Sequence, residues 1–272
     1  MSQIDDPTLE TLRTGLAAAP AVLVSVRATQ GSVPREAGTW MAVWPGRVLG
    51  TIGGGHLEFD AIAHARQLLA GATVARERRF ALGPSLGQCC GGVVHLGFEP
   101  VAPSQADASV ERLRGEQDSR RVPVALFGGG HVGRAIVQAL TPLPVRVHWI
   151  DSRDEIFPDK LAPQVRTEHS APVEAAVRDL DAGTRVLIMR FSHAEDLEIV
   201  AACLLRQRAR DDLPFVGLIG SKSKWAAFTH RLEARGFAAA EIARITCPIG
   251  VAGVVGKEPE VIAAAVAAQL MQ

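Results

Sequence analysis

The chain has 272 residues, of which 47% are hydrophobic and 21% are charged, a composition typical of a globular protein large enough for two domains. Its 29 basic residues balance its 29 acidic ones, so the formal net charge is zero and nucleic acid is not an expected partner. No tyrosine is present, which excludes the dehydrogenases that depend on a Tyr-x-x-x-Lys acid/base pair.

The start of the chain and the cysteine content both indicate where the protein works. Residues 1–10 are polar and acidic, without the basic start and apolar run of a secretory signal, and no apolar stretch reaches the length of a membrane span. Of the four cysteines, Cys89 and Cys90 are adjacent, unlike the spaced cysteines of disulfide-stabilised secreted domains. We therefore expect a cytoplasmic protein with reduced thiols and no membrane contact.

Residues 1–100 predict a mixed α/β domain. Hydrophobic periodicity and turn residues indicate two helices and five strands in this part of the chain. The expected helices cover 7–19 and 56–69, and the expected strands cover 21–29, 39–44, 48–52, 73–82 and 93–98.

Residues 101–121 are rich in Pro, Ser, Gln, Asp, Glu and Arg and predict a surface linker. Beyond it, residues 122–272 alternate between strands and helices, which predicts a Rossmann-like, doubly wound parallel sheet. Strands are expected over 122–127, 145–151, 185–191 and 215–219, and helices over 134–140, 195–208 and 258–270.

A G-x-G-x-x-G motif lies between the first strand and helix of this second domain. It contains Gly128, Gly130, His131 and Gly133, and Asp151 ends the next strand. Such glycines let an anion approach a helix N-terminus, and such an aspartate can bind a ribose hydroxyl. We expect a nucleotide or another phosphate-bearing ligand here. The alternatives are a tight turn without a ligand and, for His131, a solvent-facing position at the start of the helix.

Two further polar segments follow expected strands of the parallel sheet. Ser192 and His193 stand where open α/β sheets bind ligands, although Ser192 can also cap the next helix with Glu195 completing a capping box. We treat both as candidate site residues. After the following strand, Gly220 to Ser223 predict a helix cap with a solvated Lys222.

The N-terminal domain holds two unusual strings. Gly53, Gly54 and Gly55 directly precede a helix, which is a second place where backbone N–H groups can hold an anion. Gln88, Cys89 and Cys90 lie in a glycine-flanked loop that can present sulfur to a soft metal or a sulfur-bearing ligand, or can simply pack as small apolar residues. No zinc site is expected, since Cys247 and His95 lack the spacing, and Cys203 is expected in the core.

With these strings in view, the chain resembles the XdhC/CoxI family of accessory proteins for molybdenum hydroxylases. The similarity spans nearly the whole sequence. It is carried by the strings GSVPREAG, GTIGGGHLE, LGPSLGQCCGG, FGGGHVG, the Ser192–His193 pair, GLIGSKSK, CPIG and GKEPEVIA, in that order.

The resemblance implies a homodimeric, non-enzymatic carrier of the molybdenum cofactor. Such a carrier holds the cofactor while a cysteine desulfurase supplies its sulfido ligand, then inserts it into apo xanthine dehydrogenase. The glycine strings, the double-cysteine string and the Rossmann loop are the implied cofactor contacts. Two alternatives remain: an NAD(P)-dependent oxidoreductase, and a regulator that senses a nucleotide or redox state.

Overall fold

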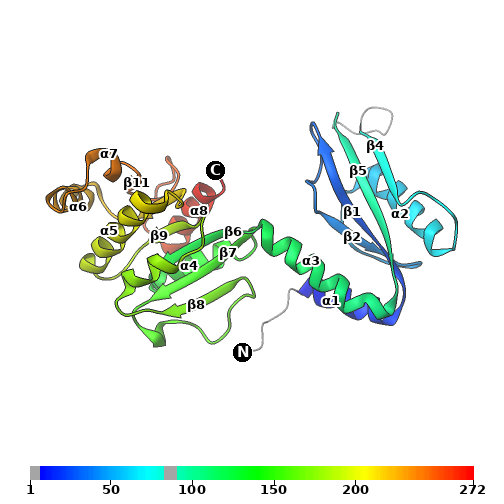
Figure 1. Ribbon diagram of the computed structural model, residues 1–272, viewed down its shortest axis with the longest axis horizontal. Coiled ribbons are helices and arrows are strands. Elements are labelled where there is room, and N and C mark those ends of the chain that lie inside the picture. The colour runs from blue at the N-terminus through cyan, green and yellow to red at the C-terminus, as the bar shows by residue number, and fades with distance from the viewer. Residues whose placement is uncertain (1–6, 83–90) are drawn as a thin grey trace. The chain divides into compact units, whose positions relative to one another are not determined.

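The computed structural model describes residues 7–82 and 91–272 of the chain (Figure 1). They form two compact units, an N-terminal unit that ends at Ser119 and a C-terminal unit, Arg120–Gln272.

The N-terminal unit is built on an antiparallel sheet of five strands in the order β3-β2-β1-β5-β4. β1 is the central strand and pairs with β2 on one side and β5 on the other. The strands are β1 (Ala21–Gln30), β2 (Trp40–Val43), β3 (Val48–Gly50), β4 (Glu77–Ala81) and β5 (Val93–Val101). The helices are α1 (Pro7–Ala18), α2 (Gly55–Leu69), the 3-10 turn η2 (Pro103–Gln105) and α3 (Ala106–Arg120).

Both faces of this sheet are buried, because β1 alternates between two hydrophobic clusters. Val22 and Val24 belong to the cluster that contains Leu57 and Ala61 of α2. Leu23, between them, belongs to the cluster formed with α1 and α3. The period-two alternation of a strand therefore places helices on both sides of the sheet.

The prediction of a surface linker over residues 101–121 is wrong, because most of that segment is helix α3. Ala106, Val110 and Leu113 form a narrow apolar stripe that is buried together with Leu12 and Leu16 of α1. The remaining surface of α3 is polar, so the segment has few large apolar residues and its stripe is not apparent from composition. The helix is thus part of the N-terminal unit, and the chain passes to the C-terminal unit after Ser119.

The C-terminal unit has a parallel sheet of six strands in the order β11-β10-β9-β6-β7-β8. The strands are β6 (Val122–Phe127), β7 (Val145–Asp151), β8 (Val165–His169), β9 (Arg185–Ile188), β10 (Phe215–Leu218) and β11 (Ile245–Thr246). The α-helices are α4 (His131–Leu140), α5 (His193–Arg210), α6 (Lys222–Ala234), α7 (Ala239–Ile242) and α8 (Pro259–Leu270). Two 3-10 segments are η3 (Asp154–Ile156) and η4 (Val173–Asp179).

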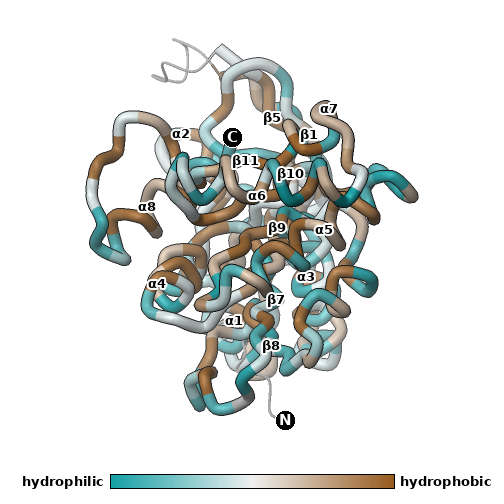
Figure 2. Tube along the Cα trace, turned by 90° about the vertical axis from the view of Figure 1, so that its left-hand side faces the viewer, coloured by the Kyte–Doolittle hydropathy of each residue, from teal (hydrophilic) through white to brown (hydrophobic). Residues whose placement is uncertain are grey.

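This strand order confirms the expected doubly wound sheet of a Rossmann fold. The chain starts at β6 in the middle, builds outward through β7 and β8, and then returns to build β9, β10 and β11 on the other side. One face packs against α4 and α8, and the other against α5, α6 and η4. The central strands, such as β9, are largely hydrophobic (Figure 2). The order reverses between β6 and β9, where such sheets bind ligands at their carboxyl edge.

The structure adds β8, β11 and α7, which the sequence did not predict, and it shortens the expected strand over 73–82 to β4. It also adds the full length of α6, of which the sequence predicted only the cap, now found at Ser221. Within residues 7–82 and 91–272, no helix combines the length and the apolar character that crossing a membrane requires.

Candidate functional site

The glycine-rich turn after β6 is shaped by close packing at two of its glycines. Gly128 has φ +132°, and a Cβ atom there would lie 2.5 Å from the carbonyl oxygen of Met189. A Cβ atom at Gly133 would lie 2.1 Å from the carbonyl oxygen of Gly128, because α4 packs directly against the turn. These two glycines are therefore required by the fold itself.

Gly130 differs from both, since nothing in the described chain requires a glycine there. Its φ of −71° and ψ of −173° are open to any residue, and a Cβ atom built on it would meet no atom within 4 Å. Gly130 is the N-cap of α4, so the N–H groups of the first helical turn point outward beside it without partners inside the helix. The missing side chain leaves the helix N-terminus open to a ligand.

A cleft of about 570 Å³ opens beside this helix N-terminus. It lies at the carboxyl ends of β6, β9 and β10, across the point where the strand order reverses. Its walls are the glycine turn and the start of α4, the segment after β7, and the ends of β9 and β10. The lining residues are Gly129, Gly130, His131, Val132, Gly133, Arg134, Arg153, Ile156, Met189, Arg190, Phe191 and Ile219.

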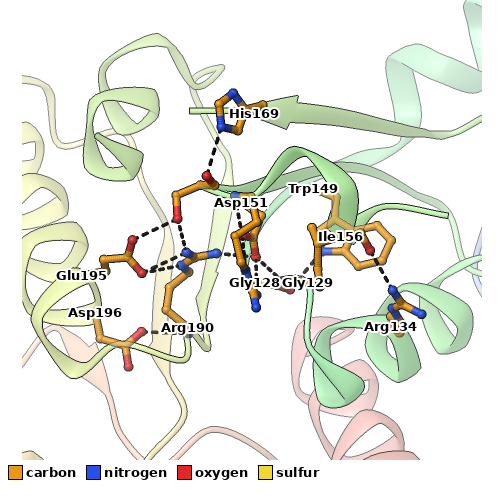
Figure 3. A network of polar contacts seen from close by, with 12 residues as sticks. Gly128, Gly129, Arg134, Trp149, Asp151, Ile156, His169, Arg190, Glu195 and Asp196 are labelled. Atoms are coloured by element: carbon orange, nitrogen blue, oxygen red, sulfur yellow. Dashed lines mark hydrogen bonds and ion pairs between the residues drawn. The ribbon is translucent and has the colours of Figure 1, made fainter. Parts of the chain in front are cut away.

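Asp151, at the end of β7, lies under the glycine turn and is completely buried (Figure 3). Its Oδ2 accepts a hydrogen bond from the backbone N–H of Gly129 at 2.7 Å, and its Oδ1 accepts one from the N–H of Arg153 at 2.9 Å. The guanidinium groups of Arg153 and Arg190 form ion pairs with the same carboxylate. Burial acts to raise the pKa of Asp151, but hydrogen bonds from Arg153, Arg190 and the backbone outweigh it and lower the pKa to about 2.

The expected contact between Asp151 and a ribose is therefore corrected. The carboxylate binds groups of its own chain, and it fixes the position of the glycine turn instead of facing the cleft. Sequence alone did not indicate this, because Arg190 is far from Asp151 along the chain and becomes its neighbour only through the pairing of β6 with β7 and β9.

Arg190, which sequence analysis missed, connects three elements of the site. Its side chain is only 2% exposed. Its guanidinium donates to Glu195 Oε2 at 2.8 Å and to the Ser152 hydroxyl, which itself donates to Glu195 Oε1 at 3.0 Å (Figure 3). A charged residue two positions after the end of the apolar strand β9 was the available signal, since a buried arginine has to find carboxylate partners.

The structure places Ser192 as the N-cap of α5, where its hydroxyl accepts a hydrogen bond from the N–H of Glu195. The carboxylate of Glu195 binds Arg190 and Ser152, so the expected capping box is only half formed. His193 is exposed at the first position of α5, and its ring stacks edge-on against Phe228. His131 is also exposed, but unlike His193 it lines the cleft.

A second buried ion pair holds the ends of β9 and β10 together. The ammonium of Lys224 donates to Asp196 Oδ2 at 2.6 Å and to the carbonyl of Ile219 at 2.9 Å. The other oxygen of Asp196 accepts the N–H of Arg190 at 2.9 Å. Burial raises the pKa of Asp196 above its usual value, although Lys224 opposes the shift. No sequence motif pointed to either residue.

In the N-terminal unit, the turn from Thr51 to Gly54 binds a carboxylate of the chain itself. Glu58 Oε2 accepts hydrogen bonds from the N–H groups of Ile52 at 3.0 Å and Gly54 at 3.1 Å, and from the Thr51 hydroxyl at 2.5 Å. Gly53 and Gly55 also have positive φ, which explains why three glycines are needed. Glu58 therefore occupies the turn in which the sequence predicted an external anion, and contact of these glycines with a cofactor stays a prediction.

The remaining candidates concern cysteines. Gln88, Cys89 and Cys90 lie outside the described residues, so their role stays a prediction. Cys203 is fully buried in the core, as expected, and burial raises the pKa of its thiol to about 12. Cys247 is partly buried, and its sulfur lies 3.3 Å from the position of a Cβ atom built on Gly220.

An antiparallel α/β unit followed by a Rossmann domain with a glycine-lined cleft defines a two-domain class of α/β protein. Residues 16–80 match the model of the XdhC and CoxI family, and residues 124–270 match that of the XdhC Rossmann domain. Because these matches cover more than half of the chain, the protein belongs to the XdhC and CoxI family, as its motifs predicted.

Two individual proteins illustrate the relationship. The uncharacterized protein YqeB of Escherichia coli (strain K12) is 26% identical over 261 residues, which are 93% of this chain and 43% of YqeB. The chain thus spans less than half the length of that relative. A crystal structure from Bacillus halodurans that bears the name xanthine dehydrogenase superposes with a TM-score of 0.71 at 19% identity, covering 97% of this chain and 95% of that one. This likeness shows the shared fold.

Proposed function

We propose that this protein is a maturation factor for xanthine-dehydrogenase-type enzymes and that its cargo is the molybdenum cofactor. In this proposal it holds the cofactor while a cysteine desulfurase supplies sulfur, and it then delivers the cofactor to the apoenzyme. It acts as a homodimer and turns over no substrate of its own. Membership of the XdhC and CoxI family and a matching fold over nearly the whole chain support this role.

The observation that carries the proposal is the open position at Gly130. Gly130 lines the cleft at the N-terminus of α4, and because it has no side chain, a group from outside the chain can approach the N–H groups of the helix closely. The N–H groups and the dipole of α4 favour an anion at that point. The phosphate of the molybdenum cofactor meets this requirement.

The rest of the cleft suits a flat ring attached to that phosphate. Its volume, about 570 Å³, lies within the range of small-molecule sites. Phe191 lines it with a side chain that is 92% exposed, although a phenylalanine normally gains free energy from burial. Stacking of its ring on a pterin would bury this surface. Met189 and Ile219 add apolar walls.

The N-terminal unit contributes sulfur in this proposal. The thiols of Cys89 and Cys90 are soft ligands suited to a molybdenum centre or its sulfido group.

Reconstitution of an apoenzyme tests the carrier role. The protein would be expressed in a host that makes molybdenum cofactor, purified without oxygen, and mixed with apo xanthine dehydrogenase. We expect xanthine oxidation to appear in proportion to the amount of loaded protein, and to appear faster than with an equal amount of free cofactor. Failure to activate, together with bound NAD(H) and steady hydride transfer at ordinary enzymatic rates, above about 1 per second, would support the oxidoreductase instead.

A further inference from the structure

The cleft lacks the group with which Rossmann domains commonly recognise ribose. An acidic residue at the end of the second strand normally accepts hydrogen bonds from the ribose hydroxyls. Here that residue is Asp151, and it is completely buried. Its Oδ1 accepts hydrogen bonds from the backbone N–H and from Nε of Arg153. Its Oδ2 accepts hydrogen bonds from the backbone N–H of Gly129 and from Nη2 of Arg153. Since a carboxylate has about four acceptor positions, none is left for a hydroxyl.

The cleft instead presents positive charge. Arg134, Arg153 and Arg190 line it together with His131, and no carboxylate lines it among the residues that the structure describes. Arg190 is 2% exposed and is held by Glu195 and Asp151. Arg153 is held on one side by Asp151 while its side chain remains 48% exposed, so it can also contact a ligand. Arg134 is anchored through the carbonyl of Ile156 at 2.8 Å.

This arrangement favours a dianionic phosphate over a neutral diol. A guanidinium donates to phosphate oxygens with fixed, charge-assisted geometry and has no acceptor to offer a hydroxyl. In Rossmann domains an arginine beside the second strand accommodates the 2′-phosphate of a nucleotide. We infer that the cleft selects ligands that end in a phosphomonoester and rejects ligands that offer a ribose diol at that position, with Arg153 as the specificity-determining residue.

Applied to the cargo, this inference rests on the proposed function. Unextended molybdopterin ends in a phosphomonoester, whereas the nucleotide-extended cofactor ends in a nucleoside joined through a pyrophosphate and carries a ribose diol. The protein is therefore expected to carry the unextended form. A nucleotide with a 2′-phosphate has the same terminal chemistry, and the experiment separates the two sources.

The first arm of the test compares NADP⁺ with NAD⁺, which differ only in the 2′-phosphate, by calorimetric titration of the full chain freed of bound ligand. NADP⁺ should bind about tenfold more tightly or better. Arg153→Ala should abolish this preference. Arg146→Ala is the matched control, because Arg146 is 46% exposed, pairs with Asp181 at 3.0 Å and does not line the cleft. In the parent chain the preference should shrink between about 50 and 300 mM KCl.

The second arm offers the chain unextended molybdenum cofactor and the cytidine-extended form in competition. The unextended form should be retained, and Arg153→Ala should lose that selectivity. Arg153-dependent binding of NADP⁺ without retention of either cofactor form would uphold the inference and remove the carrier proposal. Equal or tighter binding of NAD⁺, preference for the extended cofactor, a preference unaffected by Arg153→Ala or by salt, or no binding in either arm would each overturn the inference.

Discussion

The carboxylate of Asp151 accepts a hydrogen bond from the backbone N–H of Gly129 at 2.7 Å, which ties the end of β7 to the glycine turn after β6. The same carboxylate neutralises Arg190, whose side chain is 2% exposed. The turn, the cleft wall and the buried arginine therefore depend on one acidic group.

Asp151→Asn should destabilise the C-terminal unit by about 3 kcal/mol at pH 7, because it leaves Arg190 with one carboxylate partner fewer in a buried place. Urea unfolding would measure the change. The pKa of Asp151 is about 2 in the folded protein, below its ordinary value of 3.8. The stabilisation that the charged Asp151 carboxylate gives to the fold is thus complete above about pH 4. It is lost as the pH falls from about 4 to 2, where the free energies of unfolding of parent and variant should converge.

The control for this substitution is Asp181→Asn, since Asp181 also pairs with an arginine but is 55% exposed. It should change stability by less than about 1 kcal/mol. Equal stability of parent and Asp151→Asn at pH 7 would show that the carboxylate does not hold the turn.

Two glycines of the same turn should differ in how much stability alanine costs. Gly133→Ala should cost about 1–3 kcal/mol, because its Cβ atom would collide with the carbonyl of Gly128. Gly130→Ala should change stability by less than about 1 kcal/mol, since its conformation suits alanine and its side is open, while glycine is the better N-cap residue. Chemical denaturation compares them, and a similar loss in both would mean that Gly130 is held by the fold.

Loss of the ammonium of Lys224 should make stability depend on pH. Lys224→Met leaves the buried Asp196 without its cation, which costs about 3–5 kcal/mol when the carboxylate is charged. Burial already raises the pKa of Asp196, and removal of Lys224 raises it further, so protonation relieves the cost as the pH falls. The variant should be more destabilised at pH 8 than at pH 5. Lys222→Met, at an exposed neighbour, is the control, and equal losses at both pH values would contradict this account.

Sequence patterns predicted most of the framework and less of the site. The apolar run over residues 21–29, the apolar strands of the parallel sheet and the G-x-G-x-x-G motif indicated many of the elements of both units, because hydrophobic periodicity and glycine turns are local properties. The roles of Asp151 and Glu58 are not local in this sense. Glu58 occupies a turn that was expected to hold an external anion, and Asp151 fixes the glycine turn where a ribose contact was expected; only the folded chain shows where their partners lie.

Residues with long-range partners were missed for the same physical reason. Three such residues are Arg190 after β9, Asp196 in α5 and Lys224 in α6. Their ion pairs form only when the sheet brings these elements together. Helix α3 was missed because its apolar stripe is narrow and its other surface is polar.

The adjacent thiols provide a prediction that is independent of the Rossmann cleft. Cys89→Ala and Cys90→Ala should each leave the thermal melting temperature nearly unchanged, while at least one should lower the ratio of bound molybdenum to protein, because alanine cannot replace a soft sulfur contact. If the thiols only pack in a core, melting would shift and cofactor content would not. A double variant that activates apo xanthine dehydrogenase at the parent rate would remove both residues from the site.

The most direct test of the carrier account is the pterin content of three proteins purified from a host that makes molybdenum cofactor: the parent, Gly130→Val and Gly46→Val. Gly46 is the matched control, since it also has open space around its Cβ position but lies in an exposed turn of the N-terminal unit. The pterin content, measured by the fluorescence of the oxidised pterin, should be about one molecule per chain in the parent and in Gly46→Val. It should be at least about tenfold lower in Gly130→Val, and circular dichroism should show that this variant is folded. Pterin retained by Gly130→Val at the parent level, or absent from the parent itself, would contradict the account.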